Sequence, residues 1–184
     1  MKLAAPRIAP LPDQATDPAA DSPTPAAAVP NVFRTLAHHP KLLKRWLVFG
    51  NHILFKNALP ARDRELLILR TGFVCDAEYE WAQHVVIGRR VGLTEVEIAR
   101  IAEGPEADGW SEFDRVQLRA VDELRTDSFI ADETWRALSQ RYNAHQMMDL
   151  VFTVGQYTLV SMALNTFGVQ LDDGLSGFPE GTRS

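Results

Sequence analysis

The chain has 184 residues, of which 46% are hydrophobic and 23% are charged, and its formal net charge at pH 7 is −5. This composition is typical of a globular protein with one domain, and the acidic charge disfavours a nucleic-acid-binding protein, which normally carries a basic surface. The single cysteine, Cys75, excludes an internal disulfide and a cysteine-based structural zinc site.

The first 30 residues differ in composition from the rest of the chain, because seven of the eleven prolines lie among them. Such a segment is expected to be an extended arm without a helix or a central strand. We expect this arm (1–30) to lie on a surface and to contribute no catalytic group. One helical domain (31–175) and a short C-terminal tail (176–184) are expected to follow it.

Helix signals follow one another from Asn31 onward: capping residues, prolines at first helical positions and glycines at helix ends. They predict seven to eight helices, and Asp76 is expected to cap the fourth, with Cys75 as its only link to the third. In chain order the predicted helices are residues 32–36, 41–55, 61–74, 77–91, 95–103, 112–126, 132–143 and 145–167. No segment alternates with the period of two that is typical of a strand, so the predicted fold is all-α.

The apolar stretch 150–171 is the longest in the chain, and four polar side chains interrupt it, namely Gln156, Ser161, Asn165 and Gln170. A membrane-spanning helix needs about 20 predominantly apolar residues, so we expect this stretch to be a buried helix. The N-terminus also lacks the apolar run of a signal peptide. We therefore expect a cytoplasmic protein that binds neither membrane nor nucleic acid.

Two neighbouring helices direct ionisable side chains along apolar stripes. Glu80 and His84 are four residues apart on the fourth helix and therefore side by side, within a stripe of apolar residues. Glu65 shares the apolar stripe of the third helix with Ile68, whereas Arg64 is expected to point away. Two carboxylates and one imidazole are thus predicted to face the interior of the protein.

These three residues allow two interpretations, because burying an unpaired carboxylate costs several kcal/mol. In one, they form a satisfied core in which Glu80 bonds His84 and Glu65 bonds a helix terminus or an arginine. In the other, Glu65, Glu80 and His84 are the catalytic residues of an acid–base site in one pocket, with a coupled titration near neutrality.

Three further residues are candidates for substrate binding. Tyr79 and Trp81 flank the acidic residue of the fourth helix and are candidates for the wall of a pocket as well as for the core. His52 lies on an adjacent predicted helix. The sequence has no metal-ligand motif, Gly-rich phosphate loop or dinucleotide fingerprint, so no metal or cofactor is expected.

Three segments together resemble the carboxymuconolactone decarboxylase-like family, whose superfamily also contains the AhpD-type alkylhydroperoxidases. They are the run Arg64–Arg70, the segment Glu78–Trp81 with His84, and Gly92–Ile98. The resemblance covers about residues 31–171. It implies an AhpD-like helical bundle with a helical-hairpin core, assembled as a trimer or hexamer, with its active site on the third and fourth helices.

The chain departs from the peroxidase branch of this superfamily at its cysteines. That branch has Cys-x-x-Cys-x-x-x-His on the second helix of the hairpin, and counting back from His84 places Ala77 and Glu80 where the cysteines would be. Glu65 matches the proton-relay glutamate of the branch. A dithiol peroxidase needs a nucleophilic thiolate and a resolving thiol, and Cys75 lies two positions too early and has no partner. An alkylhydroperoxidase activity is therefore disfavoured.

The decarboxylase branch fits the remaining residues better. The resemblance implies a cofactor-free lyase of aromatic catabolism in which His84 donates or relays a proton, Glu80 orients it and Glu65 is the second acid–base group. Its substrate would be a small lactone or ring-cleavage carboxylic acid that is decarboxylated or isomerised. Arg62, Arg70 or a residue of another subunit would hold the substrate carboxylate.

A non-catalytic oligomeric protein that binds a small molecule is the alternative to an enzyme. A second apolar stripe on the fourth helix suggests a homo-oligomer, because the domain's own core is not expected to cover it. This stripe consists of Cys75, Tyr79, Ala82 and Val86.

Overall fold

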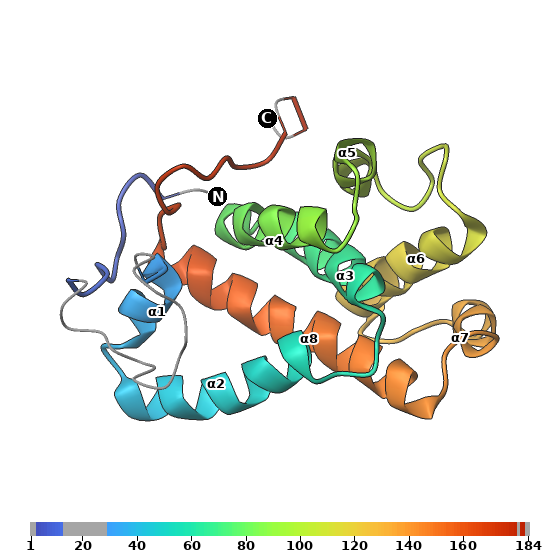
Figure 1. Ribbon diagram of the computed structural model, residues 1–184, viewed down its shortest axis with the longest axis horizontal. Coiled ribbons are helices and arrows are strands. Elements are labelled where there is room, and N and C mark those ends of the chain that lie inside the picture. The colour runs from blue at the N-terminus through green and yellow to red at the C-terminus, as the bar shows by residue number, and fades with distance from the viewer. Residues whose placement is uncertain (1–2, 13–28, 180, 183–184) are drawn as a thin grey trace.

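The computed structural model describes residues 3–12, 29–179 and 181–182, and within these residues it has eight helices and no strand (Figure 1). The all-α prediction is confirmed. In chain order the helices are α1 (Asn31–Leu36), α2 (Pro40–Phe55), α3 (Ala61–Val74), α4 (Glu78–Arg90), α5 (Glu95–Glu103), α6 (Glu112–Asp127), α7 (Asp132–Ser139) and α8 (Ala144–Phe167).

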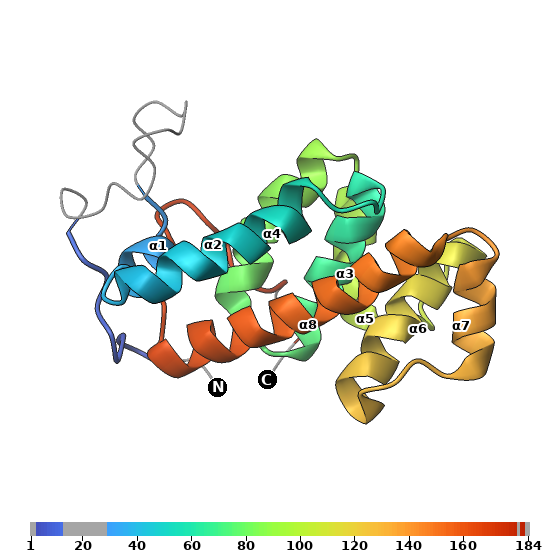
Figure 2. The same ribbon diagram turned by 90° about the horizontal axis from the view of Figure 1, so that it is seen from below.

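Helix α3 is the central helix of the bundle, and it packs against α4, α5, α6 and α8. Every residue from Glu65 to Phe73 is buried, so this helix is enclosed on all sides. The long helix α8 crosses the whole molecule, with α2 alongside it and α6 and α7 near its N-terminal end (Figures 1 and 2). The α3–α4 hairpin, which carries the predicted site residues, therefore packs against α8.

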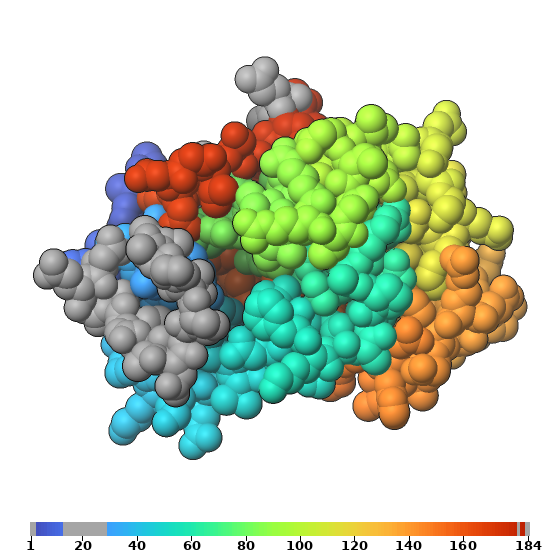
Figure 3. Space-filling view, in the orientation of Figure 1, coloured from blue at the N-terminus to red at the C-terminus, as the bar shows by residue number. Residues whose placement is uncertain are grey.

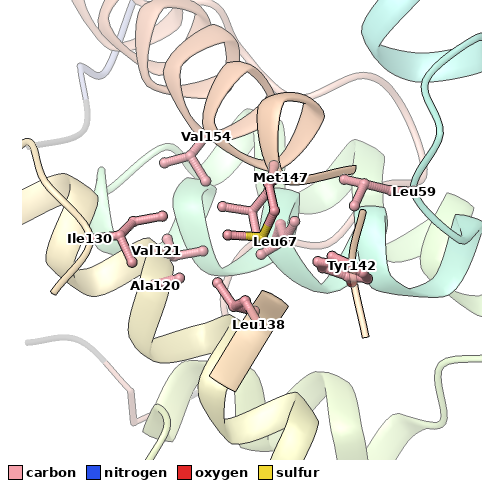
Figure 4. Close-up of a cluster of buried hydrophobic side chains, with 10 residues drawn as sticks. Leu59, Leu67, Ala120, Val121, Ile130, Leu138, Tyr142, Met147 and Val154 are labelled. Atoms are coloured by element: carbon pink, nitrogen blue, oxygen red, sulfur yellow. The ribbon is translucent and has the colours of Figure 1, made fainter. Parts of the chain in front are cut away.

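The core contains several apolar clusters on either side of α3. One of them joins α3 to α6, α7 and α8, as Figure 4 shows, and consists of Leu59, Leu67, Ala120, Val121, Ile130, Leu138, Tyr142, Met147, Leu150 and Val154. A second joins α3 to α4, α5 and α6 around Trp81, which is almost fully buried. Together these clusters fix the α3–α4 hairpin in the middle of the domain.

The turn between α3 and α4 differs from the predicted one. Asp76 does not cap α4: its φ of 54° is left-handed, and Ala77 occupies the N-cap position. The amide of Ala77 donates to the carbonyl of Gly72 at 2.9 Å, so three residues instead of one reverse the chain. Aspartate is among the residues that tolerate a left-handed conformation, and here it ends α3.

The remaining helix ends lie within a residue or two of the predicted ones, except that α7 ends at Ser139 and not near 143. Thr94 forms a capping box with Glu97 at the start of α5. Helix α8 has a capping box as well, between Asn143 and Gln146. Local side-chain hydrogen bonds thus set where these helices begin.

Both ends of the described chain pack onto the domain. The amides of Arg7 and Ile8 donate to the carbonyl of Phe167 at the end of α8, at 2.8 and 3.2 Å. Near the C-terminus, the ring of Phe178 lies 5.6 Å from that of Trp81. The greater part of the predicted arm, residues 13–28, lies outside the described residues.

The stripe that suggested a second subunit is largely covered within the chain itself. Tyr79 and Ala82 are buried, and Tyr79 packs in a cluster with Val160 and Leu164 of α8. This basis for an oligomer is therefore wrong.

Helix α8 is long and apolar enough to cross a membrane by length and composition, but half of its apolar window is buried inside the protein, as in a core helix.

Candidate active site

Three ionisable side chains meet in the interior between α3 and α4. Nδ1 of His84 lies 2.6 Å from Oε2 of Glu65, and its Nε2 lies 3.0 Å from Oε1 of Glu80. All three residues are at most 5% exposed. The predicted convergence of the two carboxylates on the imidazole is therefore present, and both ring N–H groups of a protonated His84 can donate to a carboxylate.

Arg64 is a fourth member of this group that the sequence did not indicate. Its Nε–H donates to Oε1 of Glu65 at 3.0 Å, and its side chain is only 12% exposed. The prediction that it points away is wrong, because a long flexible side chain can turn back along its own helix towards a buried carboxylate. The charges then alternate along the series Arg64, Glu65, His84 and Glu80.

The electrostatics of this series favour a protonated imidazole. Burial alone would lower the pKa of His84, but the charges and hydrogen bonds of Glu65 and Glu80 together raise it to about 9. His84 is therefore an imidazolium ion at neutral pH. The sequence predicts a coupled titration near neutrality, whereas the pKa of His84 lies in the alkaline range.

Tyr157 of α8 contacts the imidazole from the other side. Its ring lies edge-to-face with that of His84, with 4.9 Å between the centroids and 86° between the planes. Burial and the charges of Glu80 and Glu65 raise the pKa of Tyr157 well above its ordinary value, so the hydroxyl stays protonated. Sequence reasoning missed this residue because no local pattern links α8 to α4.

The site opens on a cavity of about 300 Å³ between α2, α4 and α8. Glu80 and His84 line it, whereas Glu65 is fully buried behind them. In the space-filling view a hollow separates α2 from α4, with α8 at its floor (Figure 3). The apolar part of the lining comprises Pro30, Val32, Phe33, Trp46, Leu47, Leu54, Phe55, Ile87 and Val160.

The three residues predicted to bind substrate have different positions. Tyr79 lines the cavity, although its hydroxyl already donates to Asp172 at 2.7 Å. Trp81 is not a cavity wall, because it is enclosed in the core between Phe73 and Phe178. His52 does not line the cavity: its side chain is half exposed on α2, and its Nε2 lies 3.6 Å from Oδ1 of Asp149.

Neither arginine that was expected to hold a substrate carboxylate lines the cavity. Arg62 is paired with Asp114 and Glu97. Arg70 forms two hydrogen bonds of 2.8 Å with Asp122 and joins α3 to α6. Both residues thus stabilise the packing of helices. Within the described ranges, no three His, Cys, Asp or Glu side chains are grouped so that they could hold a metal ion.

Cys75 lies outside the cavity lining as well. It is the C-cap residue of α3, and its carbonyl accepts a hydrogen bond of 2.9 Å from the side-chain amide of Asn165. No other cysteine exists in the chain to resolve an oxidised thiol. The position of Cys75 therefore agrees with the absence of a dithiol motif on α4.

Part of the chain matches the model of a known family. Residues 40–123, which include all of α3 and α4, match the model of the Carboxymuconolactone decarboxylase family. Comparison with curated protein sequences gave no match.

Solved structures show the same fold at low sequence identity. An uncharacterized peroxidase-related protein from Ralstonia eutropha JMP134, described as an alkylhydroperoxidase AhpD core, has a TM-score of 0.76 and 22% identity, over 89% of this chain and 87% of its own. An uncharacterized peroxidase-related protein from Silicibacter sp. TM1040 has a TM-score of 0.76 and 17% identity, over 93% and 91%. The debrominase Bmp8 in complex with 2,3,4-tribromopyrrole has a TM-score of 0.67 and 15% identity, over 79% and 78%.

Proposed function

We propose that this chain, a member of the carboxymuconolactone decarboxylase-like family with an AhpD-like fold, is a cofactor-free acid–base enzyme. Its substrate is a small lactone or a ring-cleavage carboxylic acid, and its reaction is a decarboxylation or an isomerisation. The observation that carries the proposal is the chain of hydrogen bonds from Glu65 through His84 to Glu80, which ends at the cavity.

Each of these three hydrogen-bonded residues has a distinct part in the proposed reaction. Glu80 lines the cavity and is the group that exchanges a proton with the substrate. His84 also lines the cavity, and as an imidazolium ion it supplies a proton or stabilises the charge on Glu80. Glu65 is a positioning residue because it is fully buried and reaches the substrate only through His84. In a decarboxylation, the electron pair of the broken C–C bond stays on the ring and the same groups protonate it.

Two observations favour this chemistry over peroxide reduction. The residues that line the cavity include a carboxylate and an imidazole but no cysteine. A cavity of about 300 Å³ also suits a small ring compound as substrate. The names of the solved neighbours, peroxidase-related or debrominase, support the fold only, because their identity to this chain is 22% or less.

A substrate screen tests the proposal. Lactones and ring-cleavage carboxylic acids are incubated with the wild-type protein, and CO₂ release and ultraviolet absorbance are followed. For any compound that reacts, Glu80→Gln should lower the rate by about 10²–10⁴-fold, as expected for loss of a general acid or base. The matched control is Glu95→Gln, which alters an exposed carboxylate of α5.

Three outcomes would contradict the proposal. One is turnover that persists in Glu80→Gln, and another is thiol-dependent reduction of hydroperoxides by the wild-type protein. The third is tight binding of a compound without turnover, which would favour a small-molecule-binding protein.

A further inference from the structure

We propose that helix α1 and the preceding Pro30 form a lid on the cavity, and that the carboxylate of Asp172 is the latch that holds this lid shut. Asp172 does not line the cavity, so it is a positioning residue that controls the access of a substrate to Glu80 and His84. It lies in the segment after α8, which runs past α1 towards α4 (Figure 1). This inference rests on the proposed function and deepens it.

The carboxylate of Asp172 accepts hydrogen bonds from donors on two helices. Its Oδ1 accepts from the amide of Asn31, the first residue of α1, at 2.8 Å. Its Oδ2 accepts from the hydroxyl of Tyr79 at 2.7 Å and from the side-chain amide of Gln83, both on α4. Burial and the hydrogen bond to Asp172 raise the pKa of Tyr79 well above its usual value, so its hydroxyl stays a donor. Hydrogen bonds to a charged acceptor are about twice as strong as neutral ones, so this one side chain ties α1 firmly to α4.

The N-terminal end of α1 depends on this carboxylate for its position. The first amides of a helix have no partner within the helix, and Pro30 at the N-cap position gives no side-chain hydrogen bond. Asp172 satisfies the amide of Asn31, and the amide of Val32 donates to the Tyr79 hydroxyl at 3.2 Å. Among the helices, α1 packs mainly against α2. Loss of the latch would therefore release this end of α1 from α4.

The C-terminal end of α1 is held independently of Asp172. The carbonyl of Arg34 accepts from the amide of Leu11 at 3.2 Å, and Nε of Arg34 donates to the Leu11 carbonyl at 2.5 Å. At the other end, the side-chain amide of Asn31 donates to the carbonyl of Gln170 at 3.1 Å. That bond is between neutral groups and is weaker than those of the latch. The lid therefore turns about its C-terminal end when the latch opens.

The lid forms an apolar part of the cavity wall close to the acid–base pair. Its three lining residues are Pro30, Val32 and Phe33. Tyr79 and Gln83, which bind the latch, line the same cavity, and each directly precedes one of the acid–base residues on α4. A closed lid keeps water away from Glu80 and His84, which strengthens their electrostatic effect on a bound substrate. An open lid lets a substrate enter and a product leave.

The reactivity of a cysteine beneath the lid tests this inference without a ligand. Val160 lines the cavity, is 7% exposed and packs with Val32 of α1. Val160→Cys in a Cys75→Ser background therefore places the only thiol of the chain under the closed lid. Its rate of reaction with N-ethylmaleimide should rise by about tenfold or more in Asp172→Asn, because asparagine keeps the size of the side chain but loses its charge and one acceptor oxygen. Asp173→Asn, at the exposed neighbouring position, is the matched control and should leave the rate unchanged.

A second reporter thiol separates opening of the lid from a loss of stability of the whole fold. Val121→Cys in the same background places the thiol in the core on α6, fully buried and outside the cavity lining. Its reaction should stay slow in Asp172→Asn, because only the lid opens.

Asn31→Pro removes the latch from the side of α1. Proline has no amide to donate to Asp172, yet it is favoured at the first position of a helix. This variant should also speed the reaction at Val160→Cys while leaving that at Val121→Cys slow. It gives the same test if Asp172→Asn does not fold.

Equal rates in Asp172→Asn and Asp173→Asn, an equal acceleration at both reporter thiols, or an unchanged rate in Asn31→Pro would each overturn the inference. The proposed function can fail separately. A faster thiol reaction without turnover of any screened lactone, among them α-angelica lactone, an uncharged unsaturated five-membered lactone, would support the latch and contradict the proposed function. Turnover of a lactone with unchanged thiol rates would support the proposed function and contradict the latch.

Discussion

His84 lies between two carboxylates, and its environment shows why a buried charged residue can be tolerated at this point. Both of its ring nitrogens face a carboxylate oxygen within 3.0 Å, and Arg64 in turn pairs with the carboxylate of Glu65. Desolvating these charges is costly, and the cost is offset only while every partner is present. Single substitutions within this group should therefore change both the pKa of His84 and the stability of the fold.

Replacing Glu65 with Gln should lower the pKa of His84 from about 9 towards its ordinary value. The charge and hydrogen bond of Glu65 are the largest causes that raise it, and glutamine removes the charge. The pKa is measured from the imidazole C–H signals by NMR, with Glu95→Gln as the control. A His84 pKa that stays unchanged in Glu65→Gln would contradict the assigned pairing.

Stability should fall as the pH rises through the alkaline range. The pKa of His84 is about 9 in the folded protein and near 6.5 in the unfolded chain. Its contribution is therefore fully present below about pH 6.5 and lost as the pH rises to about 9, a change on the order of 3 kcal/mol in the free energy of unfolding. Urea unfolding at several pH values measures it. His84→Gln should lack this pH dependence, and an equal slope in both proteins would contradict the assignment.

At the residue scale, the helical spacing of Glu65, Glu80 and His84 was enough to predict that they converge. The partners Arg64 and Tyr157 were not predictable, because one depends on the rotamer of a flexible side chain and the other on the packing of α8. The wall role proposed for Trp81 failed for a related reason. Periodicity identifies the inward face of α4, but it does not say which inward residues reach the core and which reach a cavity.

Helices α5 and α6 begin where local side-chain hydrogen bonds satisfy their first amides, whereas α1, α3, α4 and α7 have no side-chain cap. Thr94 and Ser111 cap α5 and α6, and both are residue types that favour this position, so these two helices begin where the sequence predicts. The start of α4 was not predictable from Asp76 in this way, because a tertiary turn places that residue in a left-handed conformation at the end of α3. Elements with clear caps thus follow from the sequence, and the link within the hairpin follows from packing.

The capping box of α8 should contribute measurably to stability. Replacing Asn143 with Ala removes the acceptor for the Gln146 amide and should lower the free energy of unfolding by about 1 kcal/mol. The cap residue does not line the cavity, so activity per folded molecule should not change. Urea unfolding and the rate measured with a reactive lactone check the two parts. Equal stability, or a loss of rate greater than the loss of folded protein, would contradict this account of α8.

At the scale of the whole molecule, α2 and α8 expose a broad apolar face. The rings of Phe49 and Phe152 lie 6.2 Å apart across the two helices, which run alongside each other in Figure 2. The exposed members of this face are Leu42, Phe49, Met148, Phe152, Leu159 and Met162. An apolar surface of this kind is unusual on a monomer, and we propose that it forms the interface of a homo-oligomer, a trimer or hexamer.

Charge placed on this apolar face should dissociate the oligomer. The wild-type mass from light scattering should be three or six times the chain mass of 20.6 kDa. Phe152→Asp together with Leu159→Asp should reduce it to that of one chain, because a carboxylate without a partner is unfavourable in an apolar interface. Val96→Asp, at an exposed apolar position of α5, is the control and should leave the mass unchanged. A monomeric wild-type protein would contradict the proposed assembly.

Proton exchange at the carbon next to a lactone carbonyl tests the central claim, that Glu80 and His84 form an acid–base site at the cavity, most directly. The wild-type protein in D₂O should accelerate the incorporation of deuterium into α-angelica lactone, followed by ¹H NMR, and Glu80→Gln should slow this by about 10²–10⁴-fold. The claim would be contradicted if the lactone binds in the cavity while its exchange rate stays at that of buffer alone.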